Sequence, residues 1–157
     1  MRIVRWVSVL CLTALSLVGG AACGSPGAEG TGLTAASEKL GVTDLTVGSG
    51  AAVTAGAWVR VHYSGWLQDA AGVDGKGRLF DSSHQRQEPF VFQVGKQQVI
   101  RGWEQGVVGM QTGGTRRLVI PPGLGYGTRG AGGGVIPPNA TLVFDIELLD
   151  FLPALTP

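Results

Sequence analysis

Residues 57–63 have the sequence Ala57-Trp58-Val59-Arg60-Val61-His62-Tyr63, in which the two valines and the tyrosine come at every second position. Successive side chains of a β-strand point to opposite faces of its sheet, so Val59, Val61 and Tyr63 are expected on one face. The same period of two recurs in residues 116–120 and 142–148, and shorter apolar segments occupy residues 45–47 and 90–92. We therefore predict a sheet of half-buried β-strands.

One short helix is predicted between these strands. Ile100, Trp103 and Val107 stand at positions i, i+3 and i+7, which lie on one stripe of a helix, and Gly106 and Gly109 keep that helix short. Turn sequences rich in Gly, Pro, Asp and Asn at residues 74–75, 121–123 and 137–139 separate the segments. The predicted fold class is α+β, with an antiparallel β-sheet that packs one short α-helix on one face. No second domain and no internal repeat is indicated.

The composition narrows the classes of protein further. The chain has 157 residues, enough for one domain with a sizeable core, and a formal charge of +1. This balance argues against a nucleic-acid-binding protein, which would concentrate basic residues on one surface. The 27 glycines have no Gly-X-Y period, so a collagen-like structure is excluded. Because they concentrate in residues 19–50 and 123–134, we predict a flexible tether and a flexible loop there.

The first 22 residues have the features of a secretory signal. Arg2 and Arg5 precede an apolar run from Trp6 to Val18, which is shorter than the roughly 20 residues that a membrane-spanning helix needs. We predict a signal at 1–22, a tether at 23–42, a folded domain at 43–151 and a tail at 152–157. Removal of Arg2 and Arg5 with the signal would leave ten basic residues against eleven acidic ones, a formal charge of −1.

Cys23, directly after this signal, allows two interpretations. An ordinary signal would end at Ala22 and release a soluble secreted or periplasmic protein. A bacterial lipoprotein signal would instead make Cys23 the lipidated first residue of a protein anchored on the outer face of the cell membrane. We favour lipidation, because removal of Cys11 leaves Cys23 as a lone thiol in an oxidising compartment and a Gly, Ser and Pro-rich tether follows it. Against it, Gly20 stands where a lipobox has a branched aliphatic residue.

Several kinds of chemistry find no support in the residues. His62 and His84 have no carboxylate or cysteine at metal-ligand spacing, so neither a metal nor any other cofactor is predicted. No G-x-S-x-G sequence surrounds a serine. Residues 125–130 match G-x-G-x-x-G, but proline and glycine follow in place of a helix, so we exclude a dinucleotide site.

Large aromatic side chains recur near the expected turns and strand ends: Tyr63, Phe80, Phe90, Trp103, Tyr126 and Phe144. Each taken alone is more typical of a core, but together they could line an apolar site with few polar groups, such as Asp81 and the Tyr126 hydroxyl. Asp81 has the alternative interpretation of a turn residue that caps Ser82-Ser83.

All of these aromatics except Phe90 lie within ordered segments that resemble the FK506-binding-protein (FKBP) family of peptidyl-prolyl cis-trans isomerases. The segments cover about residues 43 to 151 and include Val61-His62-Tyr63-Ser64-Gly65, Phe80-Asp81-Ser82-Ser83, Gly95–Gly106, Tyr126-Gly127 and Ile136–Leu149. The resemblance implies a twisted antiparallel sheet wrapped around one short helix, in agreement with the periodicity.

The resemblance also implies a proline-binding site. The catalytic residues would be Tyr63, Phe80, Asp81, Ile100, Trp103, Tyr126 and Phe144, and the further substrate-binding residues would be Phe90, Val99, Val135 and Ile136. Trp103 would form the floor, the Ile100 N–H would bond a substrate carbonyl, and the Tyr126 hydroxyl would contact the peptide. Two departures bear on peptide selectivity. Residues 67–80 are long for the family, with 69–78 inserted or extended between strands, and Ala131-Gly132-Gly133-Gly134 replaces a bulkier sequence.

The expected function is acceleration of X–Pro rotation in exported proteins. That rotation crosses a barrier of about 18–20 kcal/mol, and an apolar site would disfavour the planar, more polar amide relative to the twisted one. No nucleophile or proton transfer is needed. The expected partners are Pro-containing polypeptides, with macrolides of the FK506 and rapamycin type as inhibitors, and the chain is expected to be a monomer. A holdase that grips Pro-containing segments without catalysis, and a purely structural role for the aromatics, are the alternatives.

Overall fold

The structure is a computed structural model that describes residues 39–154. The predicted signal, Cys23 and most of the predicted tether therefore lie outside the described residues. Within the described part, no helix is long and apolar enough to cross a membrane.

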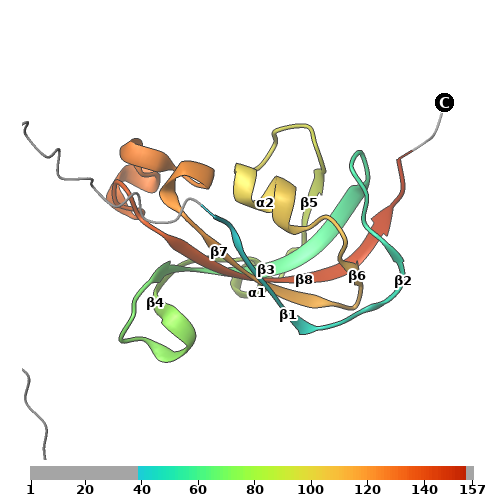
Figure 1. The fold of residues 1–157 in the computed structure, drawn as a ribbon, viewed down its shortest axis with the longest axis horizontal. Coiled ribbons are helices and arrows are strands. Elements are labelled where there is room, and N and C mark those ends of the chain that lie inside the picture. The colour runs from blue at the N-terminus through green and yellow to red at the C-terminus, as the bar shows by residue number, and fades with distance from the viewer. Residues whose placement is uncertain (1–38, 155–157) are drawn as a thin grey trace, which may run out of the picture. The chain divides into compact units, whose positions relative to one another are not determined.

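One antiparallel sheet contains most of the strands (Figure 1). Its order is β1 (Gly41–Thr46), β7 (Thr115–Ile120), β8 (Leu142–Leu152), β3 (Trp58–Gln68) and β4 (Lys76–Ser82), and β5 (Phe90–Gln93) also pairs with β3. A separate pair joins β2 (Ser49–Ala52) to β6 (Gln111–Thr112). The antiparallel α+β class predicted from the alternation is confirmed.

The central pair β3 and β8 carries the alternation that predicted the sheet. Val61 pairs with Leu148 and Tyr63 with Ile146. Val59, Val61 and Tyr63 are buried, while the intervening Trp58 and Arg60 are exposed. The strands extend slightly beyond the predicted range of 43–151, because β1 begins at Gly41 and β8 ends at Leu152.

The other edge of β3 has two partners in succession. β5 pairs with Trp58 to Val61 and β4 pairs with Ser64 to Gln68, and the single-turn helix α1 (Ser83–Arg86) lies between β4 and β5 in the chain. At the change of partner, the Tyr63 N–H donates to the buried Ser83 Oγ at 2.8 Å. A buried backbone N–H needs such a partner, so Ser83 stabilises this edge of β3 at a residue that neither β4 nor β5 pairs with. This helical turn adds to the one predicted helix.

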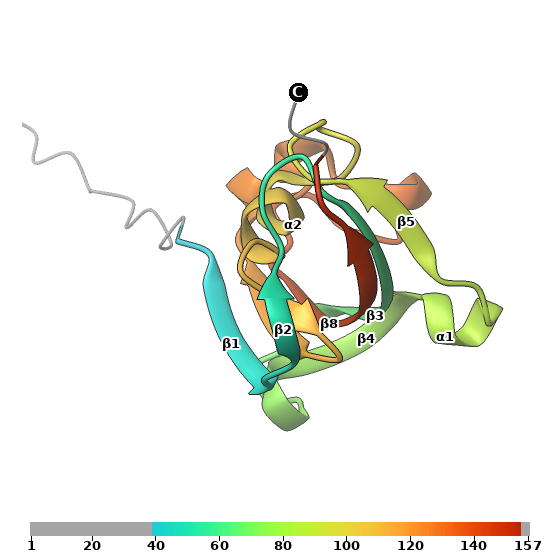
Figure 2. The ribbon, with the colours of Figure 1, turned by 90° about the vertical axis from the view of Figure 1, so that its right-hand side faces the viewer.

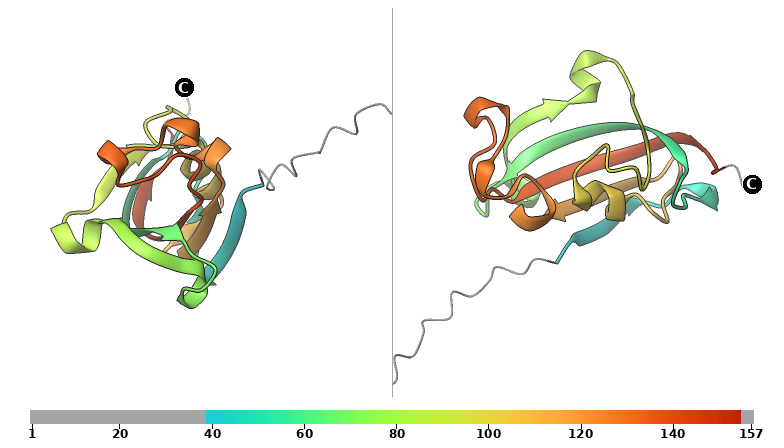
Figure 3. Two further views of the ribbon diagram at one scale, coloured as in Figure 1. Left: turned by 90° about the vertical axis from the view of Figure 1, so that its left-hand side faces the viewer. Right: turned by 90° about the horizontal axis from the view of Figure 1, so that it is seen from above.

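That predicted helix is α2 (Arg101–Gly106), which lies against the concave side of the sheet (Figures 2 and 3). Trp103 and Val107 are buried, as the predicted stripe requires. A Cβ atom on Gly102 would lie 2.6 Å from Ile120, and one on Gly106 would lie 2.4 Å from Leu118. These glycines therefore do more than shorten the helix, because they let α2 approach β7 closely.

The β3–β4 connection is shorter than predicted. Lys76, Gly77 and Arg78 belong to β4, so only residues 69–75 form the connection. Asp74 and Gly75 have φ of 57° and 73°, and the Lys76 N–H bonds the Val73 carbonyl, which closes a tight turn. Asp-Gly is a sequence that adopts this left-handed turn readily.

The glycine-rich segment, predicted as a flexible loop, contains an isolated β-bridge and two 3₁₀ turns. Ala131 and Ile136 exchange two backbone hydrogen bonds of 3.0 Å, and short 3₁₀ turns occupy Gly127–Arg129 and Gly132–Gly134. Five glycines here have positive φ: Gly127, Gly130, Gly132, Gly133 and Gly134. Glycine is needed at these positions because other residues rarely adopt that conformation. In the described part of the chain, a 3₁₀ turn at Gly132–Gly134 and then strand β8 follow residues 125–130.

Candidate active site

Six aromatic rings from five different elements meet between α2 and the sheet, and they include Phe92 of β5, whose ring lies 5.7 Å from Trp103 and which sequence reasoning did not single out. Trp103 of α2 lies at their centre, with its ring 5.0 Å from Tyr63 of β3 and 5.2 Å from Phe144 of β8. Both contacts are nearly perpendicular, an arrangement that aromatic pairs favour. Phe90 of β5 is 6.1 Å from Trp103, and Phe80 of β4 is 5.5 Å from Phe144. The tertiary structure thus brings together five of the six aromatic side chains singled out in the sequence.

The burial of these predicted residues is graded. Trp103, Phe144 and Ile136 are buried, Phe80, Val99 and Ile100 are half-buried, and Phe90, Tyr126 and Val135 are 36%, 40% and 40% exposed. The exposed Phe90 therefore borders a buried aromatic base. A hollow of about 770 Å³ elsewhere on the molecule is lined by Trp58, Gln93 and Leu152 and includes none of the predicted residues.

Close packing of this base depends on a glycine in β3. A Cβ atom on Gly65 would lie 2.6 Å from the Phe144 ring and 2.8 Å from the Phe80 ring. The glycine in the segment Tyr63-Ser64-Gly65 therefore allows two of the rings to lie against the strand.

Ile100 immediately precedes α2 and has extended backbone angles. Its carbonyl accepts hydrogen bonds from the Trp103 N–H at 2.9 Å and the Glu104 N–H at 3.2 Å. Among residues 39–154, no hydrogen bond uses the Ile100 N–H as donor. The amide that the resemblance assigned to a substrate carbonyl is therefore not committed to another described residue.

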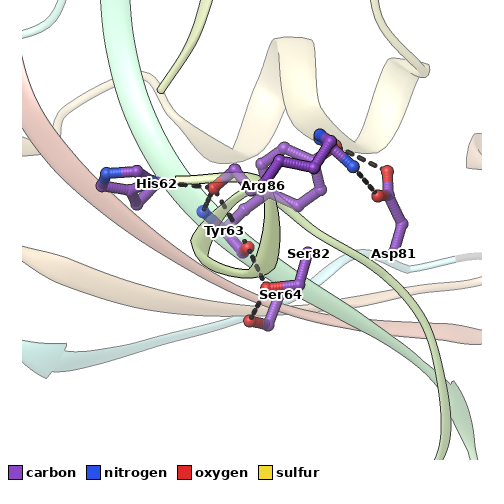
Figure 4. Close-up of polar contacts among 7 residues, drawn as sticks. His62, Tyr63, Ser64, Asp81, Ser82 and Arg86 are labelled. Atoms are coloured by element: carbon purple, nitrogen blue, oxygen red, sulfur yellow. Dashed lines mark hydrogen bonds and ion pairs between the residues drawn. The ribbon is translucent and has the colours of Figure 1, made fainter. Parts of the chain in front are cut away.

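A closed polar network borders the aromatic cluster (Figure 4). The Tyr63 hydroxyl donates to Asp81 Oδ2 at 2.6 Å, and Arg86 Nη2 donates to the Tyr63 oxygen at 2.9 Å. The Arg86 guanidinium also forms an ion pair with Asp81. Asp81 therefore orients Tyr63 and Arg86, which goes beyond capping a turn. Sequence reasoning missed Arg86, because nothing local shows that α1 turns its side chain back toward Asp81.

The network sets the protonation of its members. Burial raises the pKa of Asp81, but hydrogen bonds from Tyr63 and Arg86 outweigh burial, so the pKa is below its ordinary value. Burial, and the hydrogen bond to Asp81, raise the pKa of Tyr63, and burial also raises the pKa of Tyr126. At neutral pH the carboxyl of Asp81 is therefore ionised and both tyrosines keep their protons.

The two histidines lie beside this network. Their rings stack with centroids 4.5 Å apart, and His62 Nδ1 is 2.9 Å from Ser83 Oγ. Within residues 39–154, no cluster of three or more His, Cys, Asp or Glu side chains is arranged to hold a metal ion.

Comparison with known proteins agrees with this architecture. The family model of the FKBP-type peptidyl-prolyl cis-trans isomerases matches residues 50–149. An FK506-binding protein of Neisseria meningitidis serogroup A is 48% identical over 111 residues, which cover 71% of this chain and 94% of that protein. The crystal structure of AtFKBP13 matches with a TM-score of 0.61 and 41% identity, over 72% of this chain and 93% of that one. FkpA from Escherichia coli matches with a TM-score of 0.61 and 44% identity, over 73% of this chain and 49% of that one.

The fold and the matches define a peptidyl-prolyl cis-trans isomerase. Within that class, the chain belongs to the FKBP-type family.

Proposed function

We propose that this isomerase binds the proline ring of its substrate over the aromatic cluster, with Trp103 as the base. The observation that carries the proposal is the edge-on packing of Tyr63 and Phe144 against a Trp103 side chain that is only 4% exposed. The exposed Phe90 borders that base, and Phe90, Tyr126 and Val135 would contact the residues on either side of the proline.

The proposed mechanism is differential binding of the twisted amide. Rotation about an X–Pro bond costs about 18–20 kcal/mol because amide resonance is lost. Apolar surroundings disfavour the polar planar amide more than the twisted one, and this lowers the barrier. The Ile100 N–H and the Tyr126 hydroxyl are the donors that would hold the neighbouring peptide groups. Because Asp81 is ionised and Tyr63 is protonated, neither group is assigned a proton transfer.

Asp81 and Arg86 act in this proposal as positioning residues. Together they hold the Tyr63 hydroxyl from two sides, while the ring of Tyr63 packs edge-on against Trp103. The network therefore keeps one wall of the aromatic cluster in place without touching the rotating bond.

The test is a proline-limited peptide assay on the full chain. The wild type should accelerate cis–trans exchange, and Tyr126→Phe combined with Phe144→Ala should reduce kcat/KM by roughly ten-fold or more. Unchanged kcat/KM in the double variant would show that catalysis does not use this cluster. If only suppression of aggregation survives in the variant, the holdase interpretation accounts for that remaining activity.

We further propose that macrolides of the FK506 type bind the same cluster. Support comes from the name of the Neisseria relative and from the shared fold. FK506 should inhibit the assay competitively with the peptide, and the double variant should weaken its binding. Inhibition that higher peptide concentrations do not relieve would contradict a shared site.

We propose, finally, that Cys23 anchors an exported protein by lipidation, so that its substrates are exported polypeptides and the tether separates a monomeric domain from the membrane. The sequence of residues 1–32 supports this proposal. Two acyl chains are sufficient for stable membrane binding, whereas a single chain is marginal. Intact mass of the mature N-terminus provides the test, because an unmodified Cys23 would rule out the anchor. Cys23→Ser should release the protein into the soluble fraction.

A further inference from the structure

Residues 126–139, which include the glycine-rich loop, have few hydrogen bonds to the rest of the chain. Their backbone bonds are internal, namely Ala131 with Ile136, Val135 with Gly132 and Asn139 with Gly127, apart from one that Pro137 accepts from the adjacent Ala140. Among the described residues, the hydrogen bond that joins this segment to another element comes from Arg78 of β4, whose Nη2 donates to the Val135 carbonyl. The loop is therefore tied to the sheet at the residue next to Ile136.

A bulge in β4 directs the Arg78 side chain toward the loop. Leu79 pairs with Trp66 and Lys76 pairs with Gln68, so three residues of β4 span two of β3. Because side chains alternate along a strand, the extra residue reverses the face on which the following side chains lie. Lys76 contacts Trp66 and Asp145 on the outer face of the sheet. Beyond this bulge, Phe80 packs on Phe144 inside, and Arg78, two residues before it, reaches the Val135 carbonyl.

Gly123, three residues before this segment begins, is held in a similar way. Arg101, the first residue of α2, donates through Nη2 to the Gly123 carbonyl. Seven glycines lie between positions 123 and 134. Glycine loses more conformational freedom on ordering than any other residue, so such a segment needs external contacts to hold one conformation.

We infer that Arg78 is a positioning residue of the isomerase: it holds the glycine-rich loop so that Val135 and Ile136 border the aromatic cluster, and it thereby sets substrate affinity. This inference rests on the proposed binding of proline at that cluster. A loop that is released from Arg78 spends part of its time away from the cluster. The apparent affinity falls in proportion to the fraction of molecules in the competent conformation. The rotation step occurs only in that conformation, so its rate is unchanged.

Three full-length variants test the inference. Arg78→Met keeps the apolar stem and removes the donor, and Arg78→Lys restores a single charged donor. Arg60→Ala is the control, because it removes an equally charged and exposed side chain that pairs with Asp150 on β3 and β8. For each variant, amide hydrogen exchange is measured without substrate, and KM and kcat are measured with a proline peptide.

In Arg78→Met, exchange of the Val135 and Ile136 amides should accelerate roughly three- to ten-fold, the factor expected for loss of about one hydrogen bond. Exchange of Ile146 in β8 should be unchanged. KM should rise by a similar factor, with kcat within about two-fold of the wild type. The exchange rates and KM of Arg78→Lys should lie between those of Arg78→Met and the wild type. Arg60→Ala should match the wild type in both measurements.

The inference is overturned if loop exchange in Arg78→Met equals that of the wild type, because the loop is then held by other contacts. It is also overturned if exchange accelerates but KM does not change, because the loop then does not contribute to binding. Failure of the proposed binding site has a different signature: Tyr126→Phe with Phe144→Ala leaves kcat/KM unchanged, while the exchange result still reports on Arg78.

Discussion

At the scale of single residues, Tyr63 shows how a side chain is held without being reactive. Its hydroxyl lies between Asp81 and Arg86, its backbone N–H bonds Ser83, and its ring packs against Trp103. Each of these contacts involves a residue at least 18 positions away along the chain. Together they fix the orientation of the ring, which is what an apolar binding surface requires.

Asp81→Asn tests the role of this charge. The amide loses the ion pair with Arg86 and becomes a weaker acceptor for the Tyr63 hydroxyl. We expect kcat/KM in the peptide assay to fall roughly three- to ten-fold, equivalent to about 1 kcal/mol of lost positioning. Asp150→Asn, which breaks the exposed pair with Arg60, is the control and should retain wild-type kcat/KM. Equal kcat/KM in both variants would show that the charge of Asp81 does not contribute to catalysis.

Glycine acts in β3 as a residue that makes room for rings. Gly65→Ala would place a Cβ atom 2.6 Å from Phe144 and 2.8 Å from Phe80, so one or both rings must shift. Overpacking of this kind typically destabilises by about 1–3 kcal/mol. Urea unfolding should show this loss together with a lower kcat/KM. A fully stable variant would show that the two rings can move freely.

At the scale of elements, the approach of α2 to β7 depends on two glycines on one helix face. Gly106→Ala would normally favour a helix, because alanine has the higher helix propensity. Here the added Cβ atom would lie 2.4 Å from Leu118, and the helix would have to move from the sheet. We expect a net loss of about 1–3 kcal/mol in the free energy of unfolding. The control Gln105→Ala, at an exposed position of the same helix, should change it by less than about 0.5 kcal/mol.

The outer face of the sheet is stabilised by a charge cluster. Asp145 of β8 accepts two hydrogen bonds from Arg117 of β7, at 2.7 and 3.0 Å, and one from Lys76 of β4 at 2.6 Å. Asp74 in the β3–β4 turn lies 3.3 Å from Arg117. Three strands and the turn are thereby joined around one carboxylate.

Asp145→Asn should therefore destabilise the fold. The substitution leaves Arg117 and Lys76 close together without their shared anion, and hydrogen bonds to charged groups contribute about 1.5–3 kcal/mol each in favourable settings. Since both cations keep partial access to water, we expect a loss of about 1–3 kcal/mol in urea unfolding. Asp150→Asn is again the exposed control. If the free energy of unfolding falls no more than in that control, the charge cluster does not stabilise the fold.

At the scale of the whole described domain, the carboxylates of Asp81 and Asp145 make the stability of the fold depend on pH. Burial raises the pKa of Asp145, but hydrogen bonds from Arg117 and Lys76 outweigh it, so that this pKa, like that of Asp81, is below its ordinary value. A depressed pKa means that the folded state binds protons more weakly than the unfolded chain. The stabilisation is fully present above the unfolded value of about 4 and is lost as pH falls through the lower folded values.

The free energy of unfolding should accordingly be insensitive to these two groups between pH 5 and 8 and should decrease below about pH 4. Denaturation at pH 7, 5 and 3 measures this dependence. Between pH 5 and pH 3, the free energy of unfolding should decrease less in Asp145→Asn than in the wild type. A wild type equally stable at pH 3 and pH 7 would contradict the assignment.

The sequence by itself determined five of the strands, β1, β3, β5, β7 and β8, together with the helix with its buried stripe and the set of aromatic residues, but it did not indicate β2, β4 or β6. Alternation and helical spacing are local properties, because they follow from the geometry of one segment against one apolar surface. Ordered motifs were sufficient to identify the family, since Tyr63, Phe80, Trp103 and Phe144 stand within them in a fixed order.

Only the tertiary structure decided which side chains act on those aromatics. Arg86 reaches Tyr63 across 23 positions, and Arg78 reaches Val135 across 57. Both contacts depend on strand pairing, on the bulge in β4 and on the turn formed by α1. Neither the register nor the bulge has a local signal, because both result from packing between segments that are distant in the chain. For the same reason, the need for glycine at positions 65, 102 and 106 follows only from the rings and side chains that the fold packs against them.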